Sequence, residues 1–325
     1  MPMTLTSVLA PVQSSLDEVE TYLREEFFSR DGVFSGILSH VGSLRGKMIR
    51  PALMLLVGRA CGGIRPGHIP VAALVEVMHT ATLIHDDVLD DAVLRRRAET
   101  INQKYGNEAS VLLGDLLFAQ TFVLLSRMNL PEVSERFSEA AELICEGELH
   151  HILRKFQVDL TEADYLKIVE GKTATLFSLS GGLGAHLAEA SDEIIQCCEK
   201  FGRSLGVAFQ IIDDCIDVIG NEGDSGKSLG MDLTKGKVTL PVIRLVEMGT
   251  EGETLQNLFG QCNDLGKEDV GRLRRLLDES GAVDYARGMA NQIAQEAKGH
   301  LDPLPDSPDK DALLSLTDLV LDRSA

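Results

Sequence analysis

Tryptophan is absent from this chain of 325 residues, and aromatic residues of all kinds make up only 5% of it. Apolar residues nevertheless account for 44% of the sequence, which is too much for a disordered chain. A core without large aromatic side chains has to be built mainly from Leu, Val, Ile, Ala and Met. This composition is typical of packed helices.

Basic residues are also scarce, because 31 Lys and Arg stand against 50 Asp and Glu. The resulting net charge of −19 argues against a nucleic-acid partner, since phosphate backbones are bound by basic surfaces. An anionic substrate would need locally concentrated cations, or bound metal ions, to overcome the overall negative field.

The six cysteines follow neither a metal-ligand spacing nor a disulfide framework, and the Cys197–Cys198 pair is interpreted as core filling. No uninterrupted apolar run reaches the ~18–20 residues that span a bilayer, and the first residues do not resemble a signal peptide. We therefore expect no transmembrane segment and a location in the reducing cytoplasm.

Helical periodicity dominates, and no run of alternating strand residues is convincing. The expected helices cover residues 5–28, 51–61, 69–91, 108–128, 132–155, 162–187, 192–219, 237–248, 268–278, 282–299 and 309–322. No change in composition marks a boundary, and there is no repeat. The sequence predicts a single all-α domain over residues 1–325.

The stretch "LIHDDVLDD" (83–91) concentrates negative charge at the end of an apolar helix. Asp86 and Asp90 are four residues apart and share a helix face, with Asp87 beside them. Three carboxylates on one face stay ionised at low cost only when a cation neutralises them. The alternative is a solvated acidic helix end, and Asp91, outside the spacing, is interpreted as such a surface acid.

A second stretch, "FQIIDDCID" (209–217), repeats the pattern with Asp213, Asp214 and Asp217. Helical bundles commonly build metal sites from carboxylates on facing helices. Mg²⁺ prefers oxygen ligands and keeps coordination positions for phosphate oxygens. Two such clusters therefore predict several Mg²⁺ ions that hold a diphosphate.

Cations accompany both clusters. They are Lys47, Arg50, Arg95, Arg96, Lys172, Lys227, Lys235 and Lys237. Each alone could be a solvated surface charge, but together they favour anion binding, through bidentate contacts from Arg and point charges from Lys. Two groups of cations suggest two phosphorylated substrates.

Ordered motifs along nearly the whole chain resemble the trans-isoprenyl diphosphate synthases, or polyprenyl synthetases. They are "GKMIRP" (46–51), "HTATLIHDDVLD" (79–90), "RR" (95–96), "GD" (114–115), "EGE" (146–148), "GKTATLF" (171–177), "FQIIDDCID" (209–217) and "GKSLGMDLTKGKVTLP" (226–241). The resemblance implies a single-domain isoprenoid-synthase helical bundle around a deep central cavity, usually a homodimer. It also implies head-to-tail (1'-4) condensation of isopentenyl diphosphate with an allylic diphosphate.

The resemblance further implies roles for individual residues. Asp86, Asp87, Asp90, Asp213, Asp214 and Asp217 would hold three Mg²⁺ ions, with Mn²⁺ as an alternative, and Asp214 and Asp217 would act partly through water. Arg95, Lys172, Lys227 and Lys237 would contact the allylic diphosphate, and Lys47, Arg50, His79 and Arg96 the isopentenyl diphosphate. Thr173 and Gln210 would stabilise the allylic cation. His79 alone could equally be a core histidine, and Arg97 departs from the Gly usual in the family.

Product length is predicted from the helix before the first cluster. Short-chain members of the family place bulky aromatics four or five residues before the first aspartate, where this chain has Thr82 and Ala81. The floor of the product site should then lie lower, at Met78, Leu74 or Phe122. We expect a C30–C50, octaprenyl-like product, with a shorter farnesyl or geranylgeranyl product as the alternative. A peripheral membrane contact could assist product release.

Three other functions were weighed. A His-Asp phosphohydrolase would leave the second cluster unexplained, and a class I terpene cyclase usually carries one aspartate-rich motif and an Asn/Ser/Glu motif. A non-catalytic synthase subunit tends to lose one cluster, whereas both are intact here.

Overall fold

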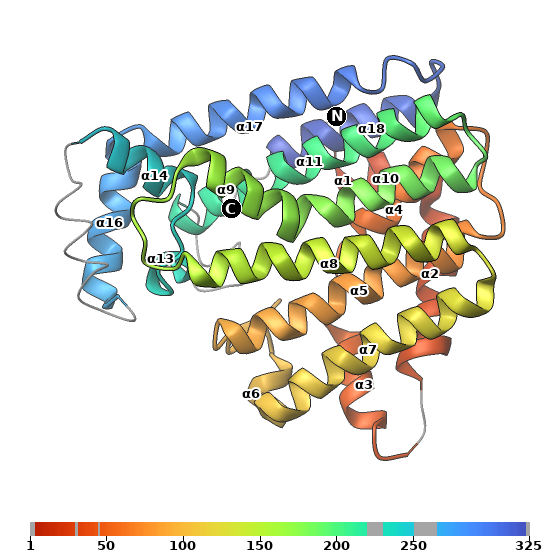
Figure 1. Ribbon diagram of the computed structural model, residues 1–325, viewed down its shortest axis with the longest axis horizontal. Coiled ribbons are helices and arrows are strands. Elements are labelled where there is room, and N and C mark those ends of the chain that lie inside the picture. The colour runs from red at the N-terminus through yellow and green to blue at the C-terminus, as the bar shows by residue number, and fades with distance from the viewer. Residues whose placement is uncertain (1–3, 30–31, 45, 220–229, 250–264, 323–325) are drawn as a thin grey trace. The chain divides into compact units, whose positions relative to one another are not determined.

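The structure, a computed structural model, describes residues 4–29, 32–44, 46–219, 230–249 and 265–322. Regular structure in these residues is helical apart from one two-stranded hairpin (Figure 1). The predicted all-α class is therefore confirmed.

The first half of the chain begins with a segmented helix and continues with longer ones. Its elements are α1 (Leu5–Leu9), η1 (Ala10–Val12), α2 (Gln13–Leu23), η2 (Arg24–Phe28), α3 (Ser35–Ser43), α4 (Ile49–Ala60), α5 (His68–Leu89), β1 (Leu94–Arg95), β2 (Ala98–Glu99), α6 (Ile101–Tyr105), α7 (Asn107–Met128) and α8 (Pro131–Leu153). The helix expected over residues 5–28 is interrupted near Pro11, which has no backbone N–H to donate. Helices α3 and α6 were not predicted.

The second half contains the longest helix of the described chain, α11. Its elements are α9 (Glu162–Val169), η3 (Glu170–Ala174), α10 (Thr175–Leu187), α11 (Asp192–Ile219), α13 (Met231–Thr234), α14 (Leu240–Glu247), α16 (Lys267–Glu279), α17 (Ala282–Gly299) and α18 (Pro308–Leu321). The predicted helix over 162–187 is one continuous run in which the π-helical turn η3 separates two α-helices. Single π-turns inside helices often mark functional sites.

The chain divides into two compact units. Unit 1 contains residues 1–139, 176–202 and 300–316, and unit 2 contains residues 140–175, 203–299 and 317–325. Each unit is described by itself below. The single domain predicted over 1–325 stays a prediction.

Unit 1 is built around α5, whose residues from Val71 to Met78 are all buried. The helix lies beside α7 (Figure 1) and also packs against α2 and α4. A helix that is apolar on every side is stable only inside a bundle. Burial of α5 therefore fixes the position of its acidic C-terminal turn.

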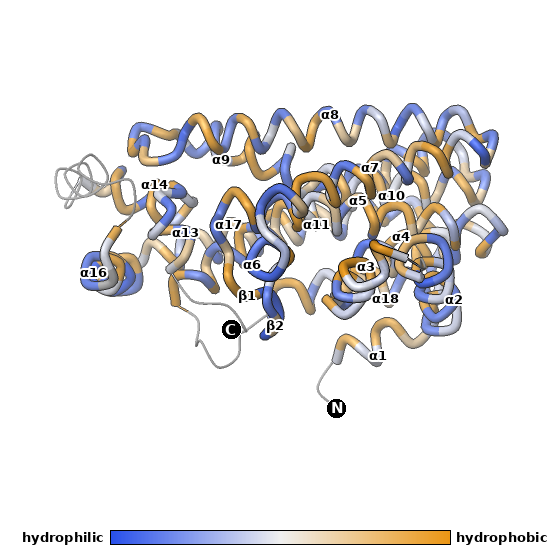
Figure 2. The backbone as a smooth tube through the Cα atoms, turned by 90° about the horizontal axis from the view of Figure 1, so that it is seen from below, coloured by the Kyte–Doolittle hydropathy of each residue, from blue (hydrophilic) through white to orange (hydrophobic). Residues whose placement is uncertain are grey.

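Unit 2 has its own core, formed by apolar residues of α9, α11, α14, α16 and α17. The helices that contribute are amphipathic, and apolar and polar residues alternate along the neighbouring α8 as well (Figure 2). Ile211, Ile212 and Cys215 of α11 are buried in this core. The polar residues between them, Asp213 and Asp214, are thereby held at one place on the helix.

The hairpin β1–β2 follows α5, with Leu94 opposite Glu99 and Arg95 opposite Ala98. Its two-residue turn consists of Arg96 and Arg97, with φ values of 53° and 67°. Positive φ at both central positions is typical of a type I′ turn, which favours Gly or Asn. Glycine would adopt this backbone more readily than Arg97 does, which fits the Gly that the resemblance leads us to expect at this position.

Helix α7 modifies one expectation from the sequence. Among the described helices it is the one long and apolar enough to cross a membrane by length and composition, with a mean hydropathy of 1.7. Leu113, Leu117 and Leu125 are buried, and core helices of globular proteins pass the same test. Leu112 and Val123 on the opposite side are exposed.

Candidate active site

The first acidic cluster occupies the last turn of α5. Asp86 and Asp87 lie within this turn, and Asp90 is the C-cap, with its N–H donating to the carbonyl of Asp86 at 2.9 Å. The C-terminal end of a helix carries a partial negative charge, so three carboxylates there repel both one another and the helix dipole. The placement favours a bound cation.

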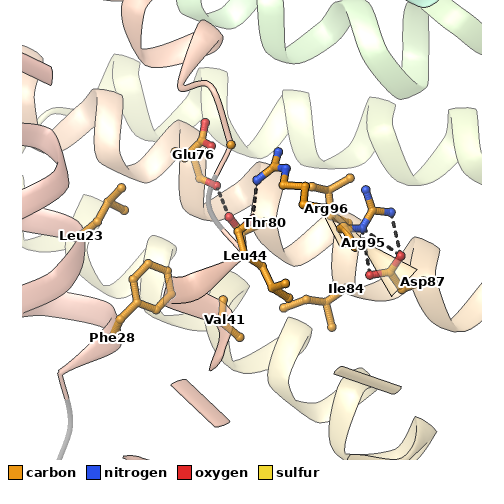
Figure 3. A pocket seen from close by; sticks show the side chains of 12 residues that line it. Leu23, Phe28, Val41, Leu44, Glu76, Thr80, Ile84, Asp87, Arg95 and Arg96 are labelled. Carbon is orange, nitrogen blue, oxygen red and sulfur yellow. Dashed lines mark hydrogen bonds and ion pairs between the residues drawn. The ribbon is translucent and has the colours of Figure 1, made fainter. Parts of the chain in front are cut away.

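Arg95 of β1 supplies one cation. Its Nη2 lies 2.7 Å from Oδ1 of Asp87, and its Nε lies 2.9 Å and 3.0 Å from the two carboxylate oxygens (Figure 3). Burial lowers the pKa of Arg95, but the hydrogen bond to Asp87 and the charges of Asp87, Asp86 and Asp90 outweigh it and raise the pKa above its ordinary value. The hairpin thus holds a fully charged guanidinium against the cluster.

Arg96 points the other way from the same hairpin. Its Nη1 donates to the carbonyl of Leu44, and its guanidinium fills the space that a Cβ on Gly46 would need. Burial lowers the pKa of Arg96, partly offset by the charge of Glu76. A side chain at position 46 would push the flexible end of Arg96 aside, so Gly46 leaves room for the guanidinium to reach Leu44.

These residues line a pocket in unit 1 (Figure 3). Asp87, Arg95, Arg96 and Glu76 form its polar side, and Leu23, Phe28, Val41, Leu44 and Ile84 its apolar side. Its volume is about 30 Å³, room for about two water molecules. The pocket as it stands does not accommodate a diphosphate without rearrangement of side chains.

The other residues predicted for isopentenyl diphosphate differ in exposure. Lys47 is exposed, whereas Arg50 and His79 are half-buried. The guanidinium carbon of Arg50 lies 4.5 Å from the centre of the Phe177 ring, a cation–π contact. This contact fixes the side chain of Arg50 against α10, while Lys47 is left in solvent.

Of the residues predicted to set product length, half-buried Phe122 lies on α7 and the others lie on α5. Met78 and Ala81 are fully buried, and the hydroxyl of half-buried Thr82 donates to the carbonyl of His79 at 2.8 Å. Leu74, one turn before Met78, is also fully buried. The small side chains at 81 and 82 therefore lie one to two turns before the aspartates, as the sequence suggested.

The second acidic cluster lies near the C-terminal end of α11, in unit 2. Asp214 is buried, and both of its carboxylate oxygens accept hydrogen bonds. The hydroxyl of Tyr165 donates to Oδ2 at 2.6 Å, and Nε2 of Gln210 donates to Oδ1 at 2.7 Å. Tyr165 belongs to α9, so this pair of bonds joins α9 to α11.

The electrostatics of Asp214 differ from those of Asp87. Burial and the charge of Asp232 raise the pKa of Asp214 to about 8, although the hydrogen bonds from Tyr165 and Gln210 lower it. Burial and the proximity of Asp214 also raise the pKa of Tyr165 well above its ordinary value. A carboxyl in this environment loses its proton readily only when a cation comes close.

Asp217 and Lys237 are joined through Asp232. The backbone N–H of Asp232 donates to Oδ2 of Asp217 at 3.2 Å, and Nζ of Lys237 lies 3.0 Å from Oδ1 of Asp232. Lys237 is buried. The carboxylate of Asp232, on the short helix α13, thus holds Lys237 near Asp217 of the second cluster. Lys237 is one of the residues predicted to contact the allylic diphosphate.

Lys172 and Thr173 are positioned by a close helix crossing. A Cβ on Gly147 of α8 would lie 2.7 Å from the backbone N of Lys172, so glycine is needed for η3 to approach α8. The crossing brings Nζ of Lys172 within 2.5 Å of Oε2 of Glu148. On the other side, the hydroxyl of Thr173 donates to Oε1 of Gln210 at 2.7 Å.

The predicted residues therefore gather in two places. In unit 1, Asp86, Asp87, Asp90, Arg95 and Arg96 come together, and in unit 2, Lys172, Thr173, Gln210, Asp213, Asp214, Asp217 and Lys237 do so. Lys227 lies outside the described residues. The roles given to these residues stay predictions.

A divalent metal fits the donor set, with one qualification. Both clusters consist of hard carboxylate oxygens at helix C-termini, the donors that Mg²⁺ and Ca²⁺ prefer. Within the described residues, however, no three Asp, Glu, His or Cys side chains already form a metal site. This arrangement suits an ion that takes most of its ligands from substrate phosphates and water rather than from a protein cage.

Four residues of the two places were not singled out from the sequence: Tyr165, Asp232, Glu148 and Glu76. Glu148 and Asp232 lie inside quoted motifs, so their acidic character next to basic residues was a usable signal. Tyr165 stands seven residues before Lys172 in an ordinary helical pattern, and nothing local indicates its partner Asp214.

Comparisons with known proteins agree with these motifs. The sequence model of the polyprenyl synthetase family matches residues 32–278. An all-trans-nonaprenyl-diphosphate synthase (geranyl-diphosphate specific) of Rhodobacter capsulatus is 35% identical over 317 residues, 97% of each chain. A geranylgeranyl diphosphate synthase of Methanosarcina mazei is 34% identical over 283 residues, 86% of each chain.

A solved structure of similar fold comes from Caulobacter crescentus. This polyprenyl synthase, complexed with calcium and isoprenyl diphosphate, has a TM-score of 0.94 and 31% identity, and the match covers 99% of this chain and 98% of that one. Fold, motifs and sequence similarity over nearly the whole chain agree. The chain belongs to the polyprenyl synthetase family of prenyltransferases.

Proposed function

We propose that this prenyltransferase is a trans-polyprenyl diphosphate synthase that requires Mg²⁺. It condenses isopentenyl diphosphate head to tail with an allylic diphosphate. The observation that carries the proposal is the matched placement of two three-aspartate patterns near helix C-termini, each beside a cation that a carboxylate holds, half-buried Arg95 in one case and buried Lys237 in the other.

We assign binding roles from the charged residues around the first cluster, in unit 1, and around the second cluster, in unit 2. Arg95, Lys172 and Lys237 are each held by a carboxylate and would exchange it for the allylic diphosphate when that substrate brings metal ions. Lys227 is assigned to the same group by resemblance. Lys47, Arg50, His79 and Arg96 are assigned to isopentenyl diphosphate. Mg²⁺, when bound by the aspartates, neutralises the diphosphate and stabilises its departure.

The chain's own side chains act on the cation that remains. Thr173 and Gln210 present oxygen atoms to the positively charged allylic carbon, which is electrostatic stabilisation by fixed dipoles. The isopentenyl double bond then attacks, and a proton is lost. By family resemblance, the released diphosphate accepts this proton.

Product length is proposed to be C30–C50, with an octaprenyl-like product as the centre. Ala81 and Met78 are buried on α5 and offer no aromatic barrier one or two turns before the first aspartate. A helical turn advances about 5.4 Å, comparable to one isoprene unit. The shorter farnesyl or geranylgeranyl product remains the alternative, because relatives of similar identity carry names of both kinds.

A homodimer is proposed from α7. Leu112, Leu116, Ala119 and Val123 are spaced by four, three and four residues on one face, and three of them are exposed. A second copy of the chain would cover this apolar stripe. We also propose that the protein is located in the cytoplasm and contacts a membrane peripherally when it releases its product.

The test is incubation of the purified protein with labelled isopentenyl diphosphate, Mg²⁺ and each of dimethylallyl, geranyl, farnesyl and geranylgeranyl diphosphate. Products are sized by reverse-phase chromatography. We expect chains of six to ten isoprene units, as proposed above. Absence of incorporation with every primer refutes the function, and products no longer than C20 select the alternative.

The variant Ala81→Phe tests whether the growing product passes Ala81 on α5. The aromatic ring would block the route along α5, so products should shorten by several isoprene units while total incorporation continues. An unchanged product distribution would show that the chain does not grow past Ala81.

A further inference from the structure

A chain of hydrogen bonds links Tyr165 to Thr173 through two residues of α11. Tyr165 donates to Asp214 at 2.6 Å, Gln210 donates to Asp214 at 2.7 Å, and Thr173 donates to Gln210 at 2.7 Å. Tyr165, Thr173 and Asp214 are buried, and Gln210 is half-buried. The four side chains form a closed connection between the α9–η3 run and α11.

The direction of these bonds is determined at each step. When a nearby cation keeps Asp214 ionised, both of its oxygens accept, and the Gln210 amide then turns its NH₂ group toward Asp214 and its oxygen toward Thr173. The hydroxyl of Thr173 has one proton, which is donated to that oxygen. The remaining lone pairs of the Thr173 oxygen then face away from Gln210.

This polarity matters for the proposed chemistry. A hydroxyl that has already donated its proton can offer only lone pairs to its surroundings, so it stabilises positive charge and does not donate to it. Were the Gln210 amide reversed, Thr173 would accept from the NH₂ group and direct its proton outward. The same residues would then oppose a developing cation.

Tyr165 fixes the end of the chain. The hydroxyl of Tyr165 is the donor to Oδ2 of Asp214, and a buried carboxylate oxygen that loses its donor incurs a desolvation cost unless it turns toward another partner. Loss of the Tyr165 hydroxyl would free Asp214 to turn, and with it the orientation of Gln210. The ring of Tyr165 would still fill its place in the core of unit 2.

We propose that Tyr165 is a positioning residue for prenyl transfer, which acts through Asp214 and Gln210 to hold the Thr173 oxygen with its lone pairs toward the allylic carbon. This role rests on the proposed function and adds to it a residue that no motif identifies. Tyr165 itself touches neither substrate. Its effect should therefore appear in turnover rather than in substrate binding.

The experiment compares Tyr165→Phe with the matched control Tyr285→Phe. The hydroxyl of Tyr285 also donates to a carboxylate, Oε2 of Glu162 at 2.8 Å, in the same unit and on the same helix α9, but outside the chain to Thr173. We expect Tyr165→Phe to lower kcat about tenfold with KM for both diphosphates within about twofold. Tyr285→Phe should keep kcat within about twofold.

A double-mutant cycle separates positioning from general damage. In the Thr173→Ala background, the oxygen that Tyr165 is proposed to hold is gone, so adding Tyr165→Phe should cost less than about twofold. An equal loss of kcat in both backgrounds, or an unchanged kcat in the single variant, overturns the proposal. Wild-type protein without any prenyl transfer would instead refute the proposed function.

Asp214→Asn serves if Tyr165→Phe does not fold. Asparagine keeps the volume but offers an NH₂ group where Oδ1 or Oδ2 stood, which favours the reversed Gln210 amide. Because Asp214 is also a proposed metal ligand, kcat is measured at saturating Mg²⁺, where we expect it to stay at least about tenfold below the wild-type value with KM for both diphosphates nearly unchanged. A kcat equal to that of the wild type would show that the polarity of the chain has no role.

Discussion

Two aspartate patterns with the same spacing are held in different ways in this protein. Asp87 of the first cluster is buried and is paired with a half-buried guanidinium, Arg95, at 2.7 Å. Asp214 of the second cluster, at the equivalent position, has a neutral tyrosine and a neutral amide as partners, and its pKa is raised to about 8. Spacing along a helix therefore predicts where carboxylates lie, while their charge depends on the side chains that the fold places against them.

The different partners of Asp87 and Asp214 suggest different roles for the two clusters. In the first cluster Arg95 pairs with Asp87, so under the proposed function a metal ion would compete with Arg95 for this carboxylate. The second cluster is hydrogen-bonded into the core of unit 2, and its buried member orients Gln210. The first cluster thus holds a carboxylate whose present partner is a cation. The second cluster holds a carboxylate that is hydrogen-bonded between α9 and α11.

The largest effect on stability should come from Asp87→Asn. The change leaves the half-buried guanidinium of Arg95 with a neutral partner in place of buried Asp87, which costs about 3 kcal/mol of unfolding free energy. Denaturant unfolding followed by circular dichroism measures it. The double variant Asp87→Leu with Arg95→Met should recover most of the loss, and a single variant as stable as the wild type would show that the pair does not stabilise the fold.

Asp214→Asn should have the opposite effect on stability. The pKa of Asp214 in the folded state, about 8, exceeds its unfolded value, so wild-type stability falls as pH rises from about 4 to about 8, where the folded state holds the extra proton. Asparagine cannot ionise and avoids this loss. We expect the variant to gain roughly 2 kcal/mol on the wild type between pH 5 and pH 7 in metal-free buffer. A difference between the two proteins that does not change with pH would contradict the raised pKa.

Gly147→Ala tests how the second site receives its cation. The added Cβ would meet the backbone of Lys172, so α8 and η3 have to separate. We expect a loss of about 2 kcal/mol in stability together with a higher KM for the allylic substrate. Gly288→Ala in α17 is the matched control, because a Cβ there meets nothing within 4 Å, and it should be neutral or stabilising. If Gly147→Ala and Gly288→Ala change stability and KM by the same amounts, α8 and η3 do not need glycine at position 147 in order to pack.

The smallest effect should come from Arg97→Gly beside the first cluster. Arg97 has a φ of 67°, which glycine adopts without strain. We expect a gain of about 1 kcal/mol in stability, measured by thermal unfolding, with kcat unchanged. A loss of stability or an increase in KM would show instead that the Arg97 side chain makes a contact that outweighs the strained backbone.

Much of the fold could be predicted from the sequence, because long amphipathic or fully apolar helices such as α5 and α11 have strong periodicity. The short helices α3 and α6 and the hairpin were missed, since their few residues carry no period. The aspartates and basic residues were found through repeated spacing and family resemblance. Tyr165 and Asp232 could not be assigned, because their partners depend on how α9 and α13 pack against α11.

The central claim is that both aspartate clusters serve one reaction despite their different surroundings. It is tested most directly by measuring diphosphate release from isopentenyl and allylic diphosphates with Mg²⁺ for Asp86→Asn, Asp213→Asn and the double variant. If both clusters serve one reaction, each single change should lower kcat at least about 100-fold and the double variant should be hardly worse, since residues that act as a unit are not additive. Near wild-type turnover in either single variant, or losses that multiply in the double one, would contradict it.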